Sequence, residues 1–545
     1  MNKYIAVIFI TGAATLALEL LASRIMTPYF GVSLYIWSGI LSITLISLAL
    51  GYFLGGKLSH RINKSSSLEL SFLLMPAVSA ISLGIACLVY PWTFFQLAQA
   101  NLVLGSFLAC IILLFFPLVT ISAMNPLLIA MRTTFNKDHL KKGDSGSGLV
   151  FFISTIGSVI GVWLTAFVFI PNITNFKSVL ILGLTLALIS MGTSLKSNNI
   201  SGIEKRYLLL VSLAGLILCG GLLSISTAYL NKDDAITHND YIWKIEQEYT
   251  SLFGNTKILS IDEPHPRHRP GNDKSKMPFR MYYQDGIMQN VIDQQGISQD
   301  VYSYAMEALT TAKNAGDSHI LILGLAGGVV PMKLAHKGIN VDVVEINPNS
   351  VTAAQEFFGF DPKLARVYRM DARSYVKQCQ KPYHIIIVDL FQGDGVPDYL
   401  LSRDFFRDLK RCTRSDGAVI FNTFTIPKYM TAYYHLLKTV KSVFAQLYMF
   451  HDEIADYNET TGIYLVAGNK DYRPRLSLSL EDAPPYIQNK LIRIFAKVRE
   501  IDSEMLSKSN IITDEFNIFP VLNIENYLGY RKTAINTIPY QFLVN

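Results

Sequence analysis

The chain has 545 residues, of which 50% are hydrophobic and only 17% are charged, with a formal net charge of +6. That charged share is well below the roughly 25% of a typical soluble domain, so the composition excludes a wholly soluble protein. The Lys and Arg residues lie in separate loops rather than in one stripe, which argues against a nucleic-acid partner.

The five cysteines give no sign of a disulfide framework. Three of them, Cys87, Cys110 and Cys219, lie within apolar runs. Cys379 and Cys412 lack the spacing of metal ligands. We therefore expect neither a disulfide-stabilised fold nor a metal site.

Seven apolar stretches precede residue 231, and each approaches the roughly 20 residues that a membrane-spanning helix needs. The fourth contains Pro117 and Pro126, which predict a kink. The first is not a signal peptide, because Glu19 lies inside it and further spans follow. The sequence thus predicts a multi-pass protein of a bacterial inner or plasma membrane, with spans at about 4–22, 33–54, 69–90, 102–131, 148–170, 178–195 and 207–230.

Two arguments about the side of the membrane disagree. The basic loops are 57–64, 132–142 and 196–206, and the positive-inside rule places them in the cytoplasm. Seven crossings would then put the C-terminal half outside. A domain that uses an adenosyl compound should instead face the cytoplasm, where such compounds are made. On that second argument we expect a cytoplasmic C-terminal domain.

Two features inside the membrane half allow a functional or a structural interpretation. Glu19 and Arg24 place an acid within a helix and a base at its end. An intramembrane acid indicates a functional site unless it makes a structural contact, either with Arg24 or with a neighbouring helix. The glycine-rich helix end at 51–56, followed by the basic residues to Arg61, resembles that of major-facilitator transporters. Its glycines are equally explained by close helix packing.

The remainder of the chain divides into three predicted segments. Residues 231–280 form a polar linker and a small subdomain, in which the His- and Arg-containing cluster 264–270 is interpreted as a solvated loop because its two histidines have no partner cysteines or carboxylates at ligand spacing. Residues 281–470 form a nucleoside-binding domain, and residues 471–545 form a C-terminal extension. The predicted fold class is therefore a multi-span helical membrane domain joined to an α/β Rossmann-type domain.

Four short apolar runs carry this Rossmann-type prediction. The run 319–323 precedes the turn Gly324-Leu325-Ala326-Gly327-Gly328 and a predicted helix over 329–337, an arrangement in which backbone N–H groups approach a ligand. The runs that follow end in acids: Glu345, where a ribose-binding acid belongs, then Asp371-Ala372 at the adenine position, then Asp389. Ligands bind at such strand ends in open α/β sheets. Each acid alone would also suit a helix N-cap.

These residues resemble the motifs of spermidine synthases, across about 280–525. The segment 283–289, ending in Gln289, is similar to the family's Leu-Asp-Gly-x-x-Gln, and Tyr302-Ser303-Tyr304 to the aromatic part of its following helix. Glu345-Ile346-Asn347 resembles its Glu-Ile-Asp, and Asp389 with Asp394 and Pro397 its Asp-x-x-Asp-Pro loop. Residues 513–517 and the membrane half resemble membrane-fused members.

The sequence also departs from the family pattern. The glycine-rich turn has Ala326 and Gly327 where the family carries an acid that grips the donor amine. The acidic pair before the helix is Gln299-Asp300, the expected His-Glu is Ala305-Met306, and two extra residues separate Asp389 from Asp394. Nucleoside binding is retained, while the acceptor is left open.

The resemblance implies transfer of an alkyl group from an adenosyl sulfonium to an amine, which needs orientation and a proton acceptor. Asp389 is the predicted base, with Asp394 and Tyr304 as helpers and Gln289 as a lid residue. The predicted nucleoside-binding residues are Gly324, Ala326, Gly327, Gly328, Glu345, Asp371 and Ala372.

Alternatives remain open at the level of the sequence. The co-substrate is decarboxylated S-adenosylmethionine or S-adenosylmethionine, so the group moved is aminopropyl or methyl. A nucleoside-binding sensor or transporter without chemistry is the rival class. The expected partners are the lipid bilayer and a small amine or membrane-confined acceptor, and a homodimer is also considered.

Overall fold

A computed structural model describes residues 2–32, 34–62, 64–135, 146–225, 235–262, 279–311, 318–391, 393–452, 454, 456–468 and 483–545. The chain forms two compact units. The first comprises residues 1–234 with 250–252 and 538–545, and the second comprises 235–249 with 253–537. The segment predicted as one C-terminal extension, 471–545, is thus shared between the two units. The predicted solvated loop at 264–270 lies outside the described residues.

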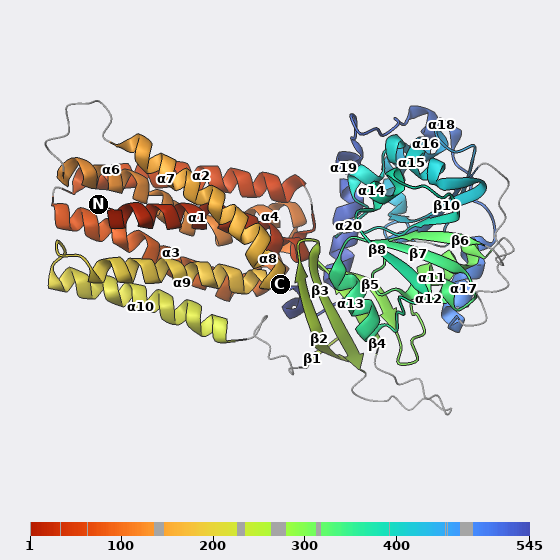
Figure 1. Cartoon of the computed structure of the whole chain (residues 1–545), viewed down its shortest axis with the longest axis horizontal. Coiled ribbons are helices and arrows are strands. Elements are labelled where there is room, and N and C mark those ends of the chain that lie inside the picture. The colour runs from red at the N-terminus through yellow and green to blue at the C-terminus, as the bar shows by residue number, and fades with distance from the viewer. Residues whose placement is uncertain are drawn as a thin grey trace. The chain divides into compact units, whose positions relative to one another are not determined.

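The first unit is a helical bundle, whose helices run alongside one another in Figure 1. Its described residues contain seven helices that are long and apolar enough to cross a membrane, which confirms the predicted number. They are α1 (Asn2–Phe30), α2 (Leu34–Arg61), α3 (Ser65–Ala100), Leu102–Thr134, Ser147–Asn172, α9 (Asn175–Leu195) and α10 (Gly202–Ser224).

Two of these spans are interrupted by π-helical turns next to proline. The fourth runs through α4 (Leu102–Cys110), η1 (Ile111–Phe115), α5 (Phe116–Ser122) and α6 (Met124–Phe135). The fifth runs through α7 (Ser147–Leu164), η3 (Thr165–Phe169) and α8 (Ile170–Asn172). The prolines Pro117 and Pro171 follow the ends of η1 and η3 closely. Because proline lacks an N–H, it removes a helical hydrogen bond there, so the interruption expected in the fourth span recurs in the fifth.

Glycines allow the membrane helices to approach closely. A Cβ added at Gly157 on α7 would lie 2.1 Å from the carbonyl oxygen of Phe9 on α1. On α2, a Cβ at Gly55 would lie 2.4 Å from the carbonyl oxygen of Ala123. The glycine-rich end of α2 therefore has a packing role, the second of its two interpretations.

The acid and base at the end of α1 do not pair. Among the described residues no Glu19–Arg24 ion pair forms; the guanidinium of Arg24 instead donates to the carbonyl oxygen of Leu252 in the same unit, at 2.7 Å. Of the two structural contacts considered for Glu19, the pairing with Arg24 is therefore absent among the described residues.

The second unit contains two sheets. The smaller is antiparallel, in the order β1-β2-β3-β4-β5. Its strands are β1 (Ile236–His238), β2 (Tyr241–Ser251), β3 (Gly254–Asp262), β4 (Phe279–Gln284) and β5 (Ile287–Ile292).

The larger sheet has the order β11-β12-β10-β9-β6-β7-β8. Strands β8, β7, β6, β9 and β10 are parallel, while β12 is antiparallel to both β10 and β11. The strands are β6 (His319–Leu323), β7 (Asn340–Glu345), β8 (Ala365–Arg369), β9 (Tyr383–Val388), β10 (Thr413–Thr425), β11 (Gln446–Phe450) and β12 (Thr461–Gly468). The four predicted apolar runs are β6 to β9, so the expected Rossmann-type sheet is confirmed.

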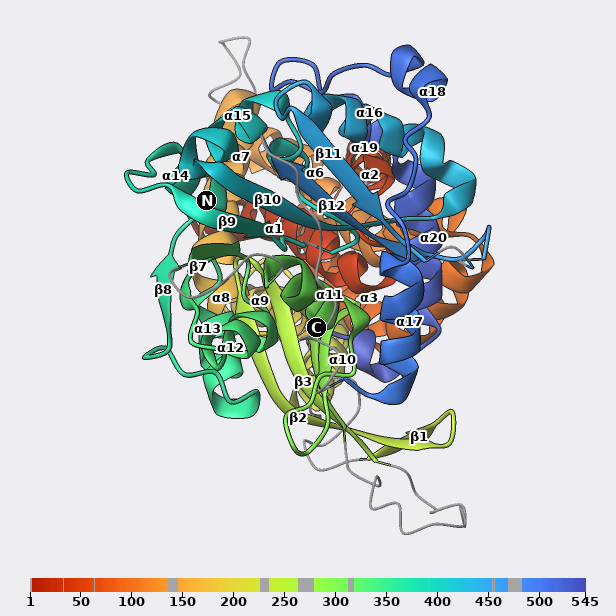
Figure 2. The same ribbon diagram turned by 90° about the vertical axis from the view of Figure 1, so that its right-hand side faces the viewer.

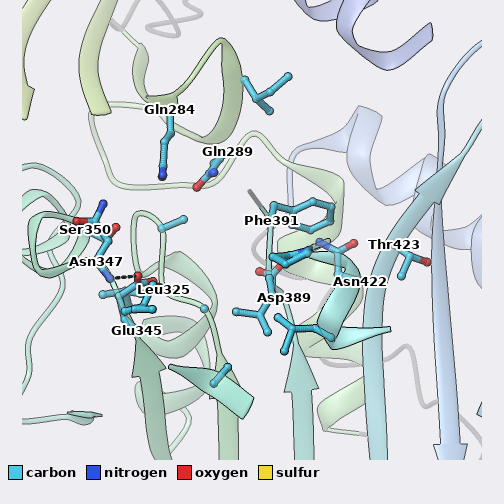
Figure 3. Close-up of a pocket in the computed structure, with 18 of the residues that line it drawn as sticks. Gln284, Gln289, Leu325, Glu345, Asn347, Ser350, Asp389, Phe391, Asn422 and Thr423 are labelled. Atoms are coloured by element: carbon cyan, nitrogen blue, oxygen red, sulfur yellow. Dashed lines mark hydrogen bonds between the residues drawn. The ribbon is translucent and has the colours of Figure 1, made fainter. Parts of the chain in front are cut away.

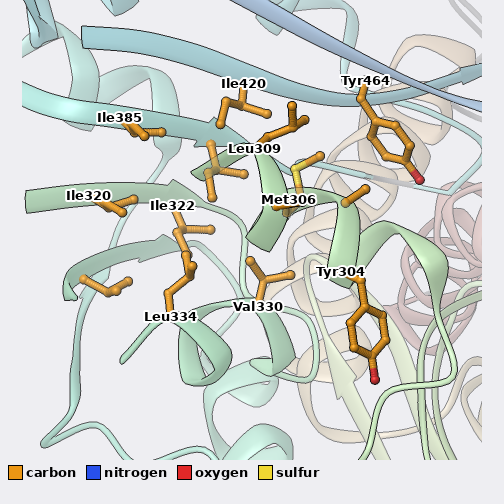
Figure 4. Close-up of a cluster of buried hydrophobic side chains, with 14 of the residues drawn as sticks. Tyr304, Met306, Leu309, Ile320, Ile322, Val330, Leu334, Ile385, Ile420 and Tyr464 are labelled. Atoms are coloured by element: carbon orange, nitrogen blue, oxygen red, sulfur yellow. The ribbon is translucent and has the colours of Figure 1, made fainter. Parts of the chain in front are cut away.

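Helices cover both faces of this sheet (Figure 2). One face packs against α11 (Val301–Thr310), α12 (Val329–Ala335) and α17 (Pro485–Phe495), and the other against α14 (Ala372–Lys377), α15 (Arg403–Cys412) and α16 (Met430–Lys441). On β6, Ile320 and Ile322 belong to the first core, shown in Figure 4, while Leu321 and Leu323 belong to the second. Burial on both faces explains why this strand is apolar at each of these positions. The remaining helices are α13 (Pro348–Phe357), α18 (Ser503–Lys508), α19 (Phe519–Leu522) and α20 (Ile524–Ile535).

A disulfide joins Cys379 and Cys412, whose Cα atoms are 5.6 Å apart. It links the loop after α14 to the last residue of α15. This corrects the expectation that the cysteines form no disulfide. The partners are 33 residues apart in sequence, and only the packing of α14 against α15 brings them together.

Candidate active site

The site lies where the order of the large sheet reverses, between the neighbouring strands β6 and β9. A cavity of about 430 Å³ opens at the carboxyl ends of β6, β7, β8 and β9. This is the position at which open α/β sheets bind ligands, and the volume lies within the range of small-molecule sites. The cavity is lined by the predicted residues Gln289, Gly324, Ala326, Glu345, Asp371, Ala372 and Asp389.

The glycine-rich turn after β6 is held by its own hydrogen bonds. The N–H of Leu325 donates to Glu345 Oε2 at 3.0 Å, and the N–H of Gly327 donates to Asn290 Oδ1 at 2.7 Å. The N–H of Gly328 donates to the carbonyl oxygen of Leu325. These N–H groups are therefore committed within the protein rather than offered to a ligand, and Gly327 and Gly328 do not line the cavity.

Of the glycines in this turn, Gly324 leaves the least room for a side chain. Its φ is +100°, and an added Cβ would lie 2.1 Å from the carbonyl oxygen of Asp389 at the end of β9. The turn must therefore pass directly over the neighbouring strand, and this brings it close to the predicted catalytic carboxylate.

Glu345 ends β7 and fixes the turn on one side of the cavity. Its Oε2 accepts from the N–H of Leu325, and its Oε1 accepts from the N–H of Asn347 at 2.7 Å. Burial raises the pKa of this carboxyl group, and the backbone donors partly oppose that effect. Figure 3 shows Glu345, Asn347 and Leu325 grouped on one side, with Asp389 and Asn422 on the other.

Asp371 caps a helix and also lines the cavity. Its Oδ1 accepts from the N–H of Ser374 at 2.8 Å, and its Oδ2 accepts from the Tyr399 hydroxyl at 3.1 Å. The N-cap role that any of these acids could have is therefore real for Asp371. It coexists with a position on the cavity wall beside Ala372.

Asp389 follows β9 and accepts a hydrogen bond from Asn422 Nδ2, at 2.9 Å, from the adjacent strand β10. Burial raises the pKa of its carboxyl group to about 6, and the Asn422 bond acts in the opposite direction. An acid with a pKa near neutral can take up and release a proton during a reaction.

Two predicted catalytic residues do not line the cavity. Tyr304 is fully buried in the hydrophobic core of Figure 4, where its hydroxyl donates to the carbonyl oxygen of Ser298 at 3.0 Å. Asp394 is also buried, and Arg531 Nε lies 2.5 Å from its Oδ1. Tyr304 therefore has a structural position, and the charge of Asp394 is balanced within the protein.

Other residues take part in the cavity wall without having been predicted. Tyr302 lines it and accepts a hydrogen bond from Asn290 Nδ2. Asn422 supports Asp389, and three aromatic residues, Phe391, Phe424 and Tyr530, complete that side. Tyr302 was within the recognised aromatic motif, whereas nothing in the sequence around Asn422 or Tyr530 indicated a site. No cluster of three or more potential metal ligands occurs among the described residues.

This doubly wound sheet, with acids at successive strand ends around one cavity, defines an α/β domain of the Rossmann type. Residues 299–477 match the Spermine/spermidine synthase domain family. The chain therefore contains a spermine/spermidine synthase domain in its C-terminal region, as the motifs predicted.

The similar proteins include both an aminopropyltransferase and a methyltransferase. The chain is 29% identical over 212 residues to a polyamine aminopropyltransferase of Vibrio vulnificus, a match that covers 37% of this chain and 69% of that protein. It is 29% identical over 144 residues to an N-terminal histidine N-methyltransferase of Emericella nidulans, covering 25% of each. A probable spermidine synthase structure from Corynebacterium glutamicum aligns at 16% identity with a TM-score of 0.40, covering 50% of this chain and 96% of that one. The family match and the polyamine aminopropyltransferase relatives together support an aminopropyltransferase-like enzyme in the C-terminal region.

Proposed function

We propose that this protein transfers the aminopropyl group of decarboxylated S-adenosylmethionine to an amine. The observation that carries the proposal is the charge of the cavity. Three carboxylates line it, Glu345, Asp371 and Asp389, and no Lys, Arg or His is among its described lining residues. Such a wall suits a donor that carries a positively charged sulfonium and no carboxylate.

The same observation separates the two candidate donors. S-adenosylmethionine carries a carboxylate that would enter the cavity without a cationic partner, and an uncompensated buried charge costs about 3–5 kcal/mol. The decarboxylated donor lacks that group. Aminopropyl transfer is therefore favoured over methyl transfer, although the fungal relative is a methyltransferase.

In the proposed arrangement, the two sides of the cavity have different roles. Glu345 and Asp371 hold the ribose and adenine, and the sulfonium faces Asp389 on the opposite side. The amine attacks the carbon next to sulfur, and Asp389 accepts its proton. Gln289, on β5, closes the cavity across from Glu345 (Figure 3). A base beside the sulfonium is what a sensor would not need, so an enzyme is favoured over the sensor.

Calorimetry with the two donors tests the choice of donor. We expect the full-length protein in detergent to bind decarboxylated S-adenosylmethionine at least about 100-fold more tightly than S-adenosylmethionine, the ratio that an uncompensated charge predicts. Equal affinities, or tighter binding of S-adenosylmethionine, would contradict the proposal.

We further propose that the domain lies outside the cytoplasm. The basic loops and the seven predicted crossings favour this side. The Cys379–Cys412 disulfide supports it independently, because disulfides persist mainly in oxidising compartments. The cytoplasmic expectation rested on donor supply alone, and the proposed placement requires that the donor reach the outer side.

A further inference from the structure

The acceptor side of the cavity is an aromatic wall. The rings of Phe391 and Phe424 are stacked, with centroids 5.9 Å apart and planes 16° apart, and Tyr530 follows Phe424 at 4.4 Å. All three line the cavity. Figure 3 shows Phe391 on the side of Asp389 and Asn422, away from Glu345. The amine that reaches Asp389 therefore meets ring surface, together with uncharged polar side chains such as Thr423 and Tyr464.

Among the residues that the structure describes, no second acid lines this wall beside Asp389. Asp394, which stands nearest in sequence to Asp389, is buried and paired with Arg531, and Arg531 is itself fully buried. Arg531 Nη1 also donates to the carbonyl oxygen of Asp285 at 2.9 Å. The pair is thus fixed from two directions, and its net charge is zero.

Asp300 is a further acid, on which the charge of Asp389 acts, and one of its carboxylate oxygens is occupied. Asp300 does not line the cavity, and its Oδ2 accepts from the N–H of Val291 at 2.7 Å. The two remaining wall carboxylates, Glu345 and Asp371, lie at the strand ends assigned to the nucleoside. Among the described residues that line the acceptor side, Asp389 is therefore the single carboxylate.

From this wall we infer that the acceptor is a primary monoamine on an uncharged apolar body. The inference rests on the proposed transfer and specifies its substrate class. One ammonium is matched by Asp389, and the rest of the molecule lies against Phe391, Phe424 and Tyr530. A second ammonium would lose its hydration there, and ring faces replace only part of it.

The transfer balances without a further reactant. After the ammonium gives a proton to Asp389, the nitrogen lone pair forms a bond to the aminopropyl carbon attached to sulfur. The C–S bond breaks and its electrons remain on sulfur, which leaves neutral 5′-methylthioadenosine. Asp389 then releases the proton to solvent, and the product is the N-aminopropyl amine.

A matched pair of acceptors tests the inference. Pentylamine and putrescine have the same number of heavy atoms and differ by a methyl group in place of an ammonium. With the full-length protein and decarboxylated S-adenosylmethionine, kcat/KM for pentylamine should exceed that for putrescine by at least about 10-fold. A preference for putrescine, or equal use, overturns the inference and leaves the proposed transfer intact. Transfer to neither amine overturns both.

Variants of Phe424 test whether the aromatic wall determines the preference for pentylamine over putrescine. Phe424→Glu adds a carboxylate and should shift the kcat/KM ratio towards putrescine by at least about 10-fold. Phe424→Gln has the same shape without the charge and should lower pentylamine use with no gain for putrescine. Unchanged binding of 5′-methylthioadenosine verifies that both variants fold. Equal ratios in the two variants would contradict the assignment of this wall.

A third experiment distinguishes an acceptor amine held in the membrane from one free in solution. Hexadecylamine held in phosphatidylcholine vesicles represents a membrane-borne acceptor, and pentylamine represents a free one. Aminopropylated hexadecylamine assigns the substrate to the membrane, and product from pentylamine alone assigns it to solution. Either result supports the inference.

Discussion

Asn422 on β10 donates its side-chain N–H to the carboxylate of Asp389 at the end of β9, over 2.9 Å. The contact joins two adjacent parallel strands at the point where the cavity opens. It favours the ionised form of an acid whose burial otherwise favours the protonated form. The proposed base is thus held in position by a neutral partner that leaves it able to exchange a proton.

Asp389→Asn should abolish transfer and leave binding of neutral 5′-methylthioadenosine largely intact. Asparagine keeps the shape but cannot take the proton, and losses of a general base typically reach about 10²–10⁴-fold. Steady-state kinetics and calorimetry provide the two readouts, with Asp416→Asn, on an exposed surface, as control. If the variant kept near-full turnover, Asp394 would be the better candidate for the base. If it lost nucleoside affinity, Asp389 would be assigned as a binding residue.

The rate should depend on the ionisation of Asp389. Because its pKa is raised to about 6, kcat at saturating amine should rise as the pH increases through about 6 and then level off. Asn422→Leu removes a donor that stabilises the carboxylate, so the rise of kcat should move to higher pH. The exposed Asn489→Leu should leave it in place. If kcat rose over the same pH range in all three proteins, Asp389 would be excluded as the titrating group.

Glu345→Ala should weaken the binding of adenosyl compounds by about 1.5–3 kcal/mol, the value of a lost charge-assisted hydrogen bond. The variant also leaves the N–H groups of Leu325 and Asn347 without their acceptor. Calorimetry with 5′-methylthioadenosine measures the effect, and the exposed Glu525→Ala on α20 is the matched control. Affinity equal to that of the control would remove the ribose assignment.

The side of the membrane can be decided with introduced cysteines. Lys490 lies on the exposed surface of the second unit, and Lys196 follows α9 in the first. In intact cells, an impermeant thiol reagent should label Lys490→Cys, and Lys196→Cys should react only after lysis. Cys87, Cys110 and Cys219 are buried and should give little background. The reverse pattern would restore the cytoplasmic expectation.

Much of the fold could be predicted because burial determines local sequence. Strands β6 and β9 are apolar along their length since helices cover both faces of the sheet, and each strand end carries an acid or a glycine turn. Long apolar runs predicted the seven membrane helices in the same way. By contrast, the division of 471–545 between two units depends on tertiary packing, to which no local pattern refers.

The site was harder to predict at the level of single side chains. Tyr302 and Tyr304 both belong to the recognised motif, yet residues two apart on a helix point about 200° apart. Tyr302 therefore reaches the cavity, while Tyr304 enters the core. The Arg531 partner of Asp394 is 137 residues further along the chain, so the neutralisation of that acid follows only from the folded structure.

The central claim is that the C-terminal domain performs aminopropyl transfer with Asp389 as base. Mass spectrometry of the full-length protein supplied with decarboxylated S-adenosylmethionine and pentylamine tests it most directly. The account predicts 5′-methylthioadenosine and aminopropylated amine in equal amounts, with neither formed by Asp389→Asn. A donor that binds but stays unchanged with every amine, or S-adenosylhomocysteine formed from S-adenosylmethionine in its place, would contradict it.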